Sequence, residues 1–429
     1  MNNNIKYILD TLKQGQNVFL TGGAGVGKSY TIDKIIKSEK FKTVVLASTA
    51  LAAINIGGDT VHRFFKLRLA KNLGELRNTK SEINALNKTL NDIELIIIDE
   101  VSMISAELFE MIIYRLRDFP NIKLLIVGDF YQLEPVNADG NYAFKSPAWI
   151  KSNFKTIELC TQYRMEDKEF YDNLQKVRQG RINQDCVDFF KRFILLDDIK
   201  SYDDYTIICG TNDEAKNINI SKLKELSSDE LSFSMKINYK ESFKKTYEND
   251  FNSWVKGLPI EQDFKFKIGA KVIFTHNSDI YFNGMQGEII DYKDDEIKVR
   301  VNQNRYIYSI KPKDFLYFND PEIAAAYRAN PTEVNENPDA IVSAYPLKLA
   351  YAITIHKSQG MSIDKLICKC DRIFAQGQLY VALSRSSNPD NFKISFSLGE
   401  RAFNNMFYQK AKANADVQNF YDTCDKECL

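Results

Sequence analysis

The sequence predicts an α/β protein with more than one domain, and three observations support this prediction. At 429 residues the chain is too long for one hydrophobic core. Short apolar runs of strand length, such as "ELIIID" and "KLLIVGD", end in acidic residues or glycine. Helical patterns alternate with these runs, which is typical of parallel sheets. In such sheets, ligands bind at the carboxyl ends of the strands.

The composition is that of an ordinary globular protein, with 44% hydrophobic and 27% charged residues. No apolar stretch approaches the roughly 20 residues of a membrane helix, so we expect no membrane partner. The N-terminus "MNNNIKYILDTLKQG" lacks a basic region followed by an apolar one, so no export signal is expected. Seven cysteines without a CxxC pair indicate reduced thiols in a cytoplasmic compartment of bacterial or viral type.

The net charge of zero counts mildly against nucleic acid as a partner, because phosphate binding depends on clustered lysine and arginine. One local cluster stands out. Between Arg63 and Lys80 the chain carries six basic residues and one acidic residue. A solvated basic helix explains this cluster equally well, so the cluster alone decides nothing.

The stretch "NVFLTGGAGVGKSYTIDKIIK" predicts a strand, a glycine-rich phosphate loop and a helix that begins near Lys28. Its GxxxxGK[ST] pattern turns successive backbone N–H groups inward toward a phosphate, and the helix N-terminus adds positive potential. Lys28 is expected to reach the β- and γ-phosphates, and the Ser29 hydroxyl to bind Mg²⁺. The predicted nucleotide-binding residues are Gly23, Ala24, Gly25, Val26, Gly27, Lys28, Ser29 and Tyr30.

A second buried strand, in "ELIIIDEVSM", ends at Asp99 and Glu100. The first carboxylate can hold Mg²⁺ through water, and the second can polarise the attacking water. Together with the phosphate loop, this acidic pair predicts a nucleotide triphosphatase.

A third strand, in "LIVGDFYQLEPV", carries Gln132 beyond its tip. The helical pattern "SAELFEMIIYRLRD" before it predicts a crossover, so this strand should run parallel to the other two. Gln132 should then reach the γ-phosphate or the water that attacks it.

These segments, with others further along, resemble the Pif-one (petite integration frequency) family of superfamily-one DNA helicases, relatives of the RecD-like enzymes. Seven ordered blocks carry the resemblance. They are "TGGAGVGKS", "ASTALAAINIGGDTVHRFF", "IIIDEVSM", "VGDFYQLEPV", "YAFKSPAW" with "IELCTQYRMEDKEFYDNLQKVRQGR", "FKFKIGAKVIFTHNSDIYFNGMQGEI", and "YPLKLAYAITIHKSQGMSID" with "GQLYVALSRSS".

The resemblance implies two RecA-like parallel-sheet motor domains with a small inserted helical wedge and an inserted Src-homology-type β-barrel. The expected boundaries are 1–155 for the first motor domain with its wedge at 66–93, 156–222 and 343–402 for the second, 223–342 for the barrel, and 403–429 for a C-terminal tail. The end of that tail is expected to be either a docking segment or a frayed helix end.

The resemblance also implies that ATP binds between the motor domains, so that its hydrolysis drives a hinge movement. Arg164 and Arg385 are the expected arginines for the charge on the transferred phosphoryl group. Tyr163 is expected to stack on the base, with packing as the alternative, and Gly360 is placed in the nucleotide site.

Single-stranded DNA and DNA junctions are the partners that the resemblance implies. Phosphate hydrogen bonds and ring stacking can hold a single strand without a large net charge. Phe64 and Phe65 could stack on bases or anchor their helix, and His276 could equally be structural. The expected DNA-contacting residues are Thr49, Asn55, His62, Phe64, His276, Asn277, Thr354 and His356.

The resemblance thus implies a monomeric, Mg²⁺- and ATP-dependent DNA helicase that moves 5′ to 3′ and serves replication, repair, recombination or telomere maintenance. An RNA-directed helicase and a nucleotide-dependent DNA clamp remain alternatives. A small-molecule phosphate-loop kinase would leave Arg385, the histidines and the second motor domain without a role.

Overall fold

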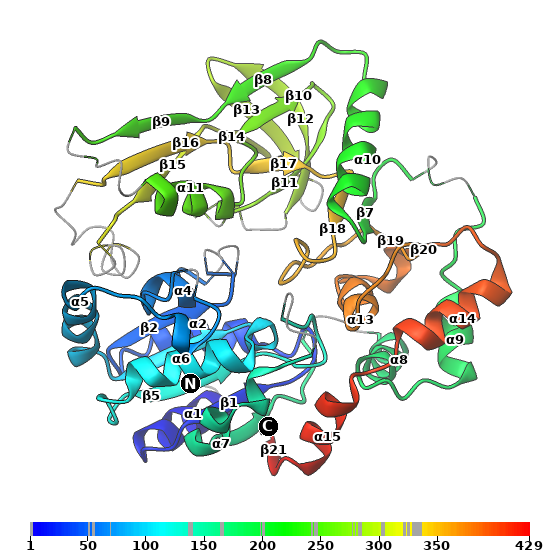
Figure 1. Cartoon of the computed structure of the whole chain (residues 1–429). Coiled ribbons are helices and arrows are strands. Elements are labelled where there is room, and N and C mark those ends of the chain that lie inside the picture. Colours follow the sequence, from blue (N-terminus) through cyan, green and yellow to red (C-terminus); the bar gives the residue numbers. More distant parts are fainter. Residues whose placement is uncertain are drawn as a thin grey trace. The chain divides into compact units, whose positions relative to one another are not determined.

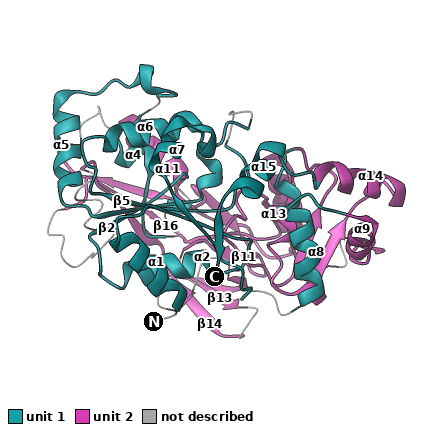
Figure 2. Cartoon of the chain, turned by 90° about the horizontal axis from the view of Figure 1, so that it is seen from below, with its two compact units in different colours: residues 1–182, 375–380, 411–429 teal, residues 183–374, 381–410 magenta. Residues whose placement is uncertain are grey.

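The structure is a computed structural model of the chain (Figure 1). It forms two compact units (Figure 2). Unit 1 comprises residues 1–182, 375–380 and 411–429, and unit 2 comprises residues 183–374 and 381–410. The residues described are 3–49, 52–53, 56–68, 70–135, 140–163, 167–197, 199, 202–241, 243, 248–276, 278, 280–281, 285–301, 305–320, 323, 327 and 337–429.

Unit 1 contains a seven-stranded sheet whose paired neighbours all run parallel, in the order β21-β6-β1-β5-β4-β2-β3. The three strands predicted to carry the site are adjacent, with β5 between β1 and β4. This arrangement confirms the predicted crossover. The strands are β1 (Val18–Thr21), β2 (Thr43–Ala47), β3 (Asp59–Thr60), β4 (Leu95–Asp99), β5 (Lys123–Val127), β6 (Lys155–Glu158) and β21 (Lys426–Cys428).

The helices of unit 1 begin at residues suited to cap them. Ser105 accepts a hydrogen bond from the Leu108 N–H at the start of α6, and Thr79 and Glu82 form a capping box at the start of α5. The α-helices are α1 (Asn3–Lys13), α2 (Lys28–Ile36), α4 (Val61–Phe64), α5 (Lys80–Asn91), α6 (Ala106–Leu116), α7 (Pro147–Ser152), α8 (Lys168–Arg178) and α15 (Ala415–Thr423). Three 3₁₀ helices are η1 (Leu73–Glu75), η2 (Val101–Met103) and η3 (Ala143–Lys145).

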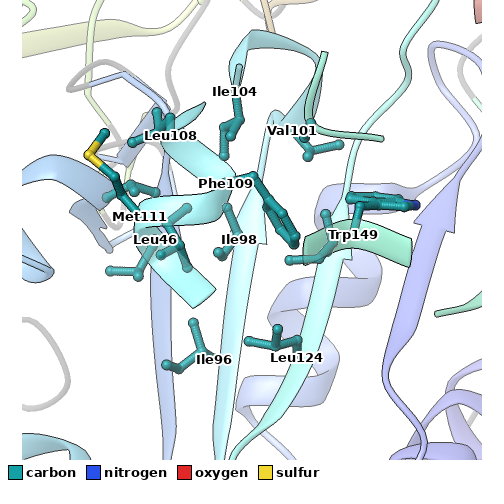
Figure 3. Close-up of a cluster of buried hydrophobic side chains, with 14 of the residues drawn as sticks. Leu46, Ile96, Ile98, Val101, Ile104, Leu108, Phe109, Met111, Leu124 and Trp149 are labelled. Carbon is teal, nitrogen blue, oxygen red and sulfur yellow. The ribbon is translucent and has the colours of Figure 1, made fainter. Parts of the chain in front are cut away.

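Both faces of this sheet are buried. Successive side chains of each strand point to opposite sides, and helices cover each side. On one face Leu46, Ile96 and Ile98 pack with the aromatic side chains of α6 and α7, Phe109 and Trp149 (Figure 3). The alternate residues on the other face pack with α1 and α2, and they include Val18, Leu20, Leu95, Ile97, Leu125 and Val127. Burial on both faces fixes the register of the strands, and with it the positions of their tips.

The C-terminal segment is folded into unit 1 as an added strand and helix. The strand β21 pairs in parallel with β6, and the Leu429 carbonyl accepts a hydrogen bond from the Cys160 N–H at 2.9 Å. Cys160 and Cys428 form a disulfide, so the prediction that all thiols are reduced is wrong for this pair. The pairing arises because parallel register brings residues 268 positions apart together, which no sequence spacing reveals. The segment is therefore not a frayed end.

Unit 2 contains a parallel four-stranded sheet in the order β18-β7-β19-β20. The second motor domain was predicted to be split between 156–222 and 343–402, and β18 from the later segment pairs directly with β7 from the earlier one. The strands are β7 (Thr206–Cys209), β18 (Ala352–Thr354), β19 (Leu366–Lys369) and β20 (Phe392–Ser395). The helices are α9 (Gln184–Lys191), α10 (Asn212–Glu225), α13 (Gln378–Leu383), whose first three residues group with unit 1, α14 (Glu400–Lys410) and the 3₁₀ helix η6 (Pro389–Asn391).

The rest of unit 2 is antiparallel. Its sheets are β14-β13-β12-β11-β17, β15-β16-β9 and β10-β8, accompanied by α11 (Glu248–Gly257). The strands are β8 (Leu231–Ser234), β9 (Lys236–Tyr239), β10 (Asp263–Phe266), β11 (Lys271–Phe274), β12 (Gln286–Lys293), β13 (Glu296–Val301), β14 (Ile307–Ile310), β15 (Lys313–Tyr317), β16 (Ala340–Ala344) and β17 (Leu347–Leu349). Within the described part of the chain, every helix is too short or too polar to cross a bilayer.

Candidate nucleotide-binding site

The phosphate loop connects β1 directly to α2, as predicted. Gly22 and Gly27 have positive φ angles of 140° and 90°, which glycine adopts at no steric cost. A Cβ atom at Gly22 would lie 2.6 Å from the Leu159 carbonyl oxygen, so a larger residue would displace the loop. The Lys28 ammonium donates hydrogen bonds to the carbonyls of Gly22 (2.7 Å) and Gly23 (2.8 Å). Lys28 is thus hydrogen-bonded to the backbone of the phosphate loop.

Acidic residues surround this lysine. Burial lowers the pKa of Lys28, while the nearby carboxylates of Asp129, Glu100 and Asp99 act to raise it. Asp99 is 7% exposed at the tip of β4. Burial and the Glu100 carboxylate raise the pKa of Asp99 to about 7. The tips of β1, β4 and β5 therefore gather charges of both signs in a desolvated region.

The backbone at Glu100 is constrained. Its φ angle is +53°, an uncommon conformation for a residue other than glycine. The Glu100 N–H donates to Asp99 Oδ1 at 2.8 Å, and the Glu100 carbonyl accepts from Ser48 Oγ at 3.3 Å. These contacts fix the direction in which the acidic pair leaves the strand.

Magnesium would find suitable ligands here. The Ser29 hydroxyl lies at the start of α2, and the Asp99 carboxylate lies at the tip of β4. Mg²⁺ prefers oxygen ligands, and it is usually held by one or two protein groups together with substrate phosphates. Among the described residues, no group of three or more His, Cys, Asp and Glu could hold a metal ion.

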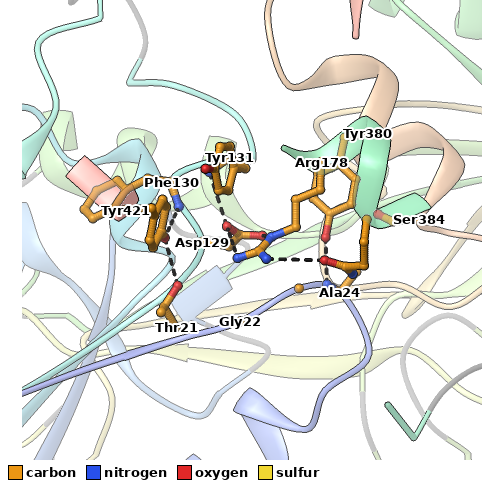
Figure 4. Close-up of polar contacts among 12 residues, drawn as sticks. Thr21, Gly22, Ala24, Asp129, Phe130, Tyr131, Arg178, Tyr380, Ser384 and Tyr421 are labelled. Atoms are coloured by element: carbon orange, nitrogen blue, oxygen red, sulfur yellow. Dashed lines mark hydrogen bonds and ion pairs between the residues drawn. The ribbon is translucent and has the colours of Figure 1, made fainter. Parts of the chain in front are cut away.

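The turn after β5, residues 129–132, is held by a buried ion pair (Figure 4). Arg178 of α8 donates from Nε to Asp129 Oδ2 (2.9 Å) and from Nη2 to Asp129 Oδ1 (3.1 Å). Both side chains are 3% exposed or less. Within the turn, the Gln132 N–H donates to the Asp129 carbonyl at 2.9 Å. Arg178 thereby fixes the backbone that carries Gln132, which is itself 6% exposed.

Residues 375–380 also contact this region. The Ala24 N–H in the phosphate loop donates to the Tyr380 hydroxyl at 2.8 Å (Figure 4). A Cβ atom at Gly377 would lie only 2.4 Å from the Gln132 carbonyl oxygen. Sequence reasoning missed Arg178 and Tyr380, and also Tyr421, whose hydroxyl accepts a hydrogen bond from the Phe130 N–H of the turn at 3.1 Å. Arg178 and Tyr380 lie within blocks that were recognised, but nothing in the spacing singles them out.

The segment after β6 runs along the phosphate loop. The Tyr163 N–H donates to the Gly25 carbonyl at 3.1 Å, and its ring lies 3.6 Å from where a Gly27 Cβ would be. The rings of Tyr163 and Tyr30 are 66% and 56% exposed, so both could stack on a base. Arg164 lies outside the described residues.

Arg385 belongs to unit 2 and is 2% exposed. Its Nε donates to the Val381 carbonyl at 2.9 Å, and its Nη1 lies 3.4 Å from the carbonyl oxygens of Ser358 and Met361. These carbonyls flank Gly360, which is exposed and has a φ angle of +79°. Arg385 is therefore bound to the loop that follows β18.

The predicted DNA-contacting residues differ in exposure. His356 is exposed, Thr49, His62 and His276 are partly buried, and Thr354 is 3% exposed. The buried His276 Nδ1 atom has no hydrogen-bond partner. Asn55 and Asn277 lie outside the described residues.

Phe64 was predicted to contact DNA, but its ring lies in the core. It is 2% exposed and packs edge-on against Phe65, with 5.0 Å between the ring centroids. Both rings belong to the hydrophobic cluster on the α6 face of the sheet. A ring so covered cannot stack on a base in this conformation, and the burial agrees with the anchoring alternative for both phenylalanines. The apolar packing of α4 against the sheet is the physical reason.

Comparisons with known proteins give one consistent result. Residues 1–187 match the model of the PIF1-like helicase family. The chain is 39% identical to the ATP-dependent DNA helicase Pif1 of Campylobacter jejuni, with 96% of each chain covered. It is 33% identical to the protein of the same name from Bdellovibrio bacteriovorus, which covers 88% of this chain and 83% of that protein.

Solved structures agree with these sequence matches. Pif1 from Bacteroides in complex with ADP-AlF4 superposes with a TM-score of 0.78 at 25% identity, covering 98% of this chain and 96% of the other. Bacteroides Pif1 with ADP-AlF3 and single-stranded DNA gives a TM-score of 0.67 at 27% identity, covering 98% and 96%.

Proposed function

Because the chain belongs to the PIF1-like helicase family and is an ATP-dependent DNA helicase, we propose that it moves along single-stranded DNA from 5′ to 3′ and so unwinds duplex or structured DNA. One observation supports the motor chemistry above all others. Three adjacent parallel strands, β1, β5 and β4, deliver Lys28, Gln132 and Asp99 to the same edge of one sheet.

We propose specific roles for these residues. Lys28 and the amides of the phosphate loop bind the β- and γ-phosphates. Glu100 orients and polarises the attacking water, and Gln132 senses the γ-phosphate. Ser29 and Asp99 would hold Mg²⁺, which when bound neutralises charge on the phosphate oxygens. Arg385 and Arg164 stabilise the charge that develops on the transferred group.

We also propose how the observed sheets correspond to functional domains. The seven-stranded and four-stranded parallel sheets would be the two RecA-like motors. Residues 66–93 would form the wedge, and the antiparallel strands within 223–342 would form the Src-homology-type barrel. Thr49, His62, His276, Thr354 and His356 would contact the DNA strand through hydrogen bonds or stacking. We propose that the enzyme works as a monomer in the cytoplasm.

Strand polarity is tested by unwinding of matched duplexes that carry a single tail, either 5′ or 3′, in the presence of ATP and Mg²⁺. Movement from 5′ to 3′ predicts that only the 5′-tailed duplex is opened. The Lys28→Ala variant is the control for ATP-independent melting. Opening of the 3′-tailed duplex alone would overturn the polarity.

The same assay separates DNA from RNA as the tracking strand. A 5′ tail of RNA in place of DNA should abolish opening if the enzyme is DNA-directed, because the 2′-hydroxyl allows a protein to distinguish the two at a given site. Preferential opening from the RNA tail would favour the RNA-directed alternative.

A further inference from the structure

The helix α15 near the C-terminus packs against the core of unit 1 and carries a buried tyrosine. Asn414 caps the helix by accepting a hydrogen bond from the Asp416 N–H, and Val417 and Tyr421 join the cluster on the α6 face of the sheet. Tyr421 is 3% exposed. The chain therefore brings a polar group into the ATP-binding unit from a position 400 residues beyond β1.

The Tyr421 hydroxyl joins the ends of two strands that carry the site (Figure 4). It lies 2.8 Å from the Thr21 hydroxyl, which immediately precedes the phosphate loop. It also accepts a hydrogen bond from the Phe130 N–H at 3.1 Å. Phe130 is within the turn between Asp129 and Gln132. One hydroxyl thus connects the last residue of β1 with the turn that follows β5.

The Tyr421 ring reinforces this connection. It stacks on the Tyr131 ring with centroids 4.8 Å apart and planes 15° apart. The Arg178 guanidinium lies over both rings, 5.1 Å from the Tyr131 centroid and 5.9 Å from that of Tyr421. The ring and the hydroxyl of Tyr421 therefore both contact the turn 129–132. Arg178 holds the same turn through Asp129.

We propose that Tyr421 is a positioning residue for ATP hydrolysis: its hydroxyl fixes the turn 129–132 relative to the phosphate loop, so that Gln132 meets the γ-phosphate in the correct geometry. The inference rests on the proposed role of Gln132. A buried N–H that loses its acceptor is costly, so without the hydroxyl the turn would relax toward another partner. A shift of this kind affects a transition-state contact more strongly than it affects ground-state binding.

The test removes the hydroxyl and keeps the ring. Tyr421→Phe should lower kcat for DNA-stimulated ATP hydrolysis about tenfold, the cost of one hydrogen bond of roughly average strength. The KM for ATP and the affinity for a fluorescent ADP analogue should change less than about twofold. Tyr142→Phe is the matched control, because Tyr142 is also buried and its ring packs on Phe130 at 5.9 Å. The control should leave kcat near the wild-type value.

A double-mutant cycle tests whether Tyr421 acts through Gln132. Gln132→Ala should lower kcat, and adding Tyr421→Phe to it should have no further effect, because the turn would no longer carry the group to be positioned. Equal effects of Tyr421→Phe in the presence and absence of Gln132 would overturn the proposal. An unchanged kcat in Tyr421→Phe would overturn it as well.

Two further measurements keep the outcomes distinct. If Tyr421→Phe does not fold, Thr21→Val removes the other hydroxyl of the pair with little change of shape, and it should reproduce the loss of kcat. A wild-type kcat in Thr21→Val would then count against the proposal. Failure of the proposed function itself would look different, since the wild-type chain would hydrolyse no ATP or Lys28→Ala would remain active.

Discussion

The two parallel sheets of the molecule are built alike but hold their polar residues differently. In unit 1 the tip of β5 is held by a side-chain ion pair, because Arg178 binds Asp129 with two hydrogen bonds. In unit 2 the loop after β18 is held by Arg385, which binds the backbone carbonyls of Ser358 and Met361. Both arginines are almost completely buried, but only Arg178 has a carboxylate partner in these hydrogen bonds.

These different contacts suggest that Arg178 and Arg385 have different roles. Arg178 is held in place by two carboxylates, because it also donates from Nη1 to Glu158 at 3.2 Å. Removing Asp129 would leave this charge in a desolvated site with only one of them. Arg385 binds the backbone carbonyls of the loop that follows β18, so its contacts tie it to that loop. We therefore interpret Arg178 as structural support for the nucleotide site, and the proposed role of Arg385 in turnover is tested by the Arg385→Ala variant below.

The largest effect is expected for Lys28→Ala. Loss of the ammonium removes the main positive charge for the phosphates and should lower the ATPase rate by at least about 10³-fold. Binding to single-stranded DNA should be partly retained, because the proposed DNA-contacting residues lie elsewhere. Steady-state hydrolysis and fluorescence anisotropy with a labelled oligonucleotide check the two parts. Retained hydrolysis would break the assignment of unit 1 as the catalytic unit.

A smaller loss of turnover is expected for Arg385→Ala. The rate of ATP hydrolysis should fall about 10²- to 10³-fold, as for the removal of one preorganised group that stabilises transition-state charge. Binding of a fluorescent ADP analogue should stay within about threefold of the wild type. Near-normal turnover would show that Arg385 is structural support like Arg178, and the contrast between the sheets would disappear.

The contrast is sharpened by a stability measurement on Asp129→Ala. This change leaves the buried Arg178 guanidinium with only the Glu158 carboxylate, 3.2 Å from its Nη1, which should cost about 3 kcal/mol of unfolding free energy, the lower end of the range for breaking a buried pair. Urea unfolding followed by circular dichroism measures the loss. The variant that also carries Arg178→Met should recover part of the stability, because no unpaired charge remains buried. A loss below about 1 kcal/mol in Asp129→Ala would contradict the role of the Asp129–Arg178 ion pair as structural support for the turn after β5.

The smallest effect is expected for His276 in unit 2. Burial, together with the nearby charge of Lys313, lowers the pKa of His276 from 6.5 to about 4. The unfolded chain binds this proton as the pH falls below 6.5, whereas the folded chain does not until about 4. Stability is thus present above 6.5 and lost toward 4. The loss should be smaller than the roughly 3 kcal/mol of the full shift, because His276 is only partly buried and solvent screens its charge. His276→Gln should remove this part of the pH dependence. Parallel pH profiles of unfolding for wild type and variant would disprove it.

The parts of the fold that local sequence patterns determine could be predicted. The glycine loop, the acidic pair and the strands β1, β4 and β5 each follow from a continuous segment whose periodicity is plain. The adjacency of the three strand tips followed from the crossover rule. The resemblance implied a β-rich insertion at 223–342, and the described strands there pair antiparallel.

Contacts made across long sequence separations could not be predicted. Tyr421 reaches Thr21 across 400 residues, and Cys160 meets Cys428 through the parallel pairing of β21 with β6. The positions of these four residues in the sequence do not suggest which residues they contact. The burial of Phe64 was also not evident, since an aromatic residue beside a basic segment fits either a core or a DNA surface.

The most direct test of the central claim compares ATP hydrolysis by the wild-type chain with and without single-stranded DNA, at saturating ATP and Mg²⁺. If the nucleotide site of unit 1 drives movement along a strand, DNA should raise the hydrolysis rate by about tenfold or more, equivalent to about 1.4 kcal/mol in the barrier. Equal rates in the two conditions would show that nucleotide turnover is not coupled to DNA, and would contradict the account.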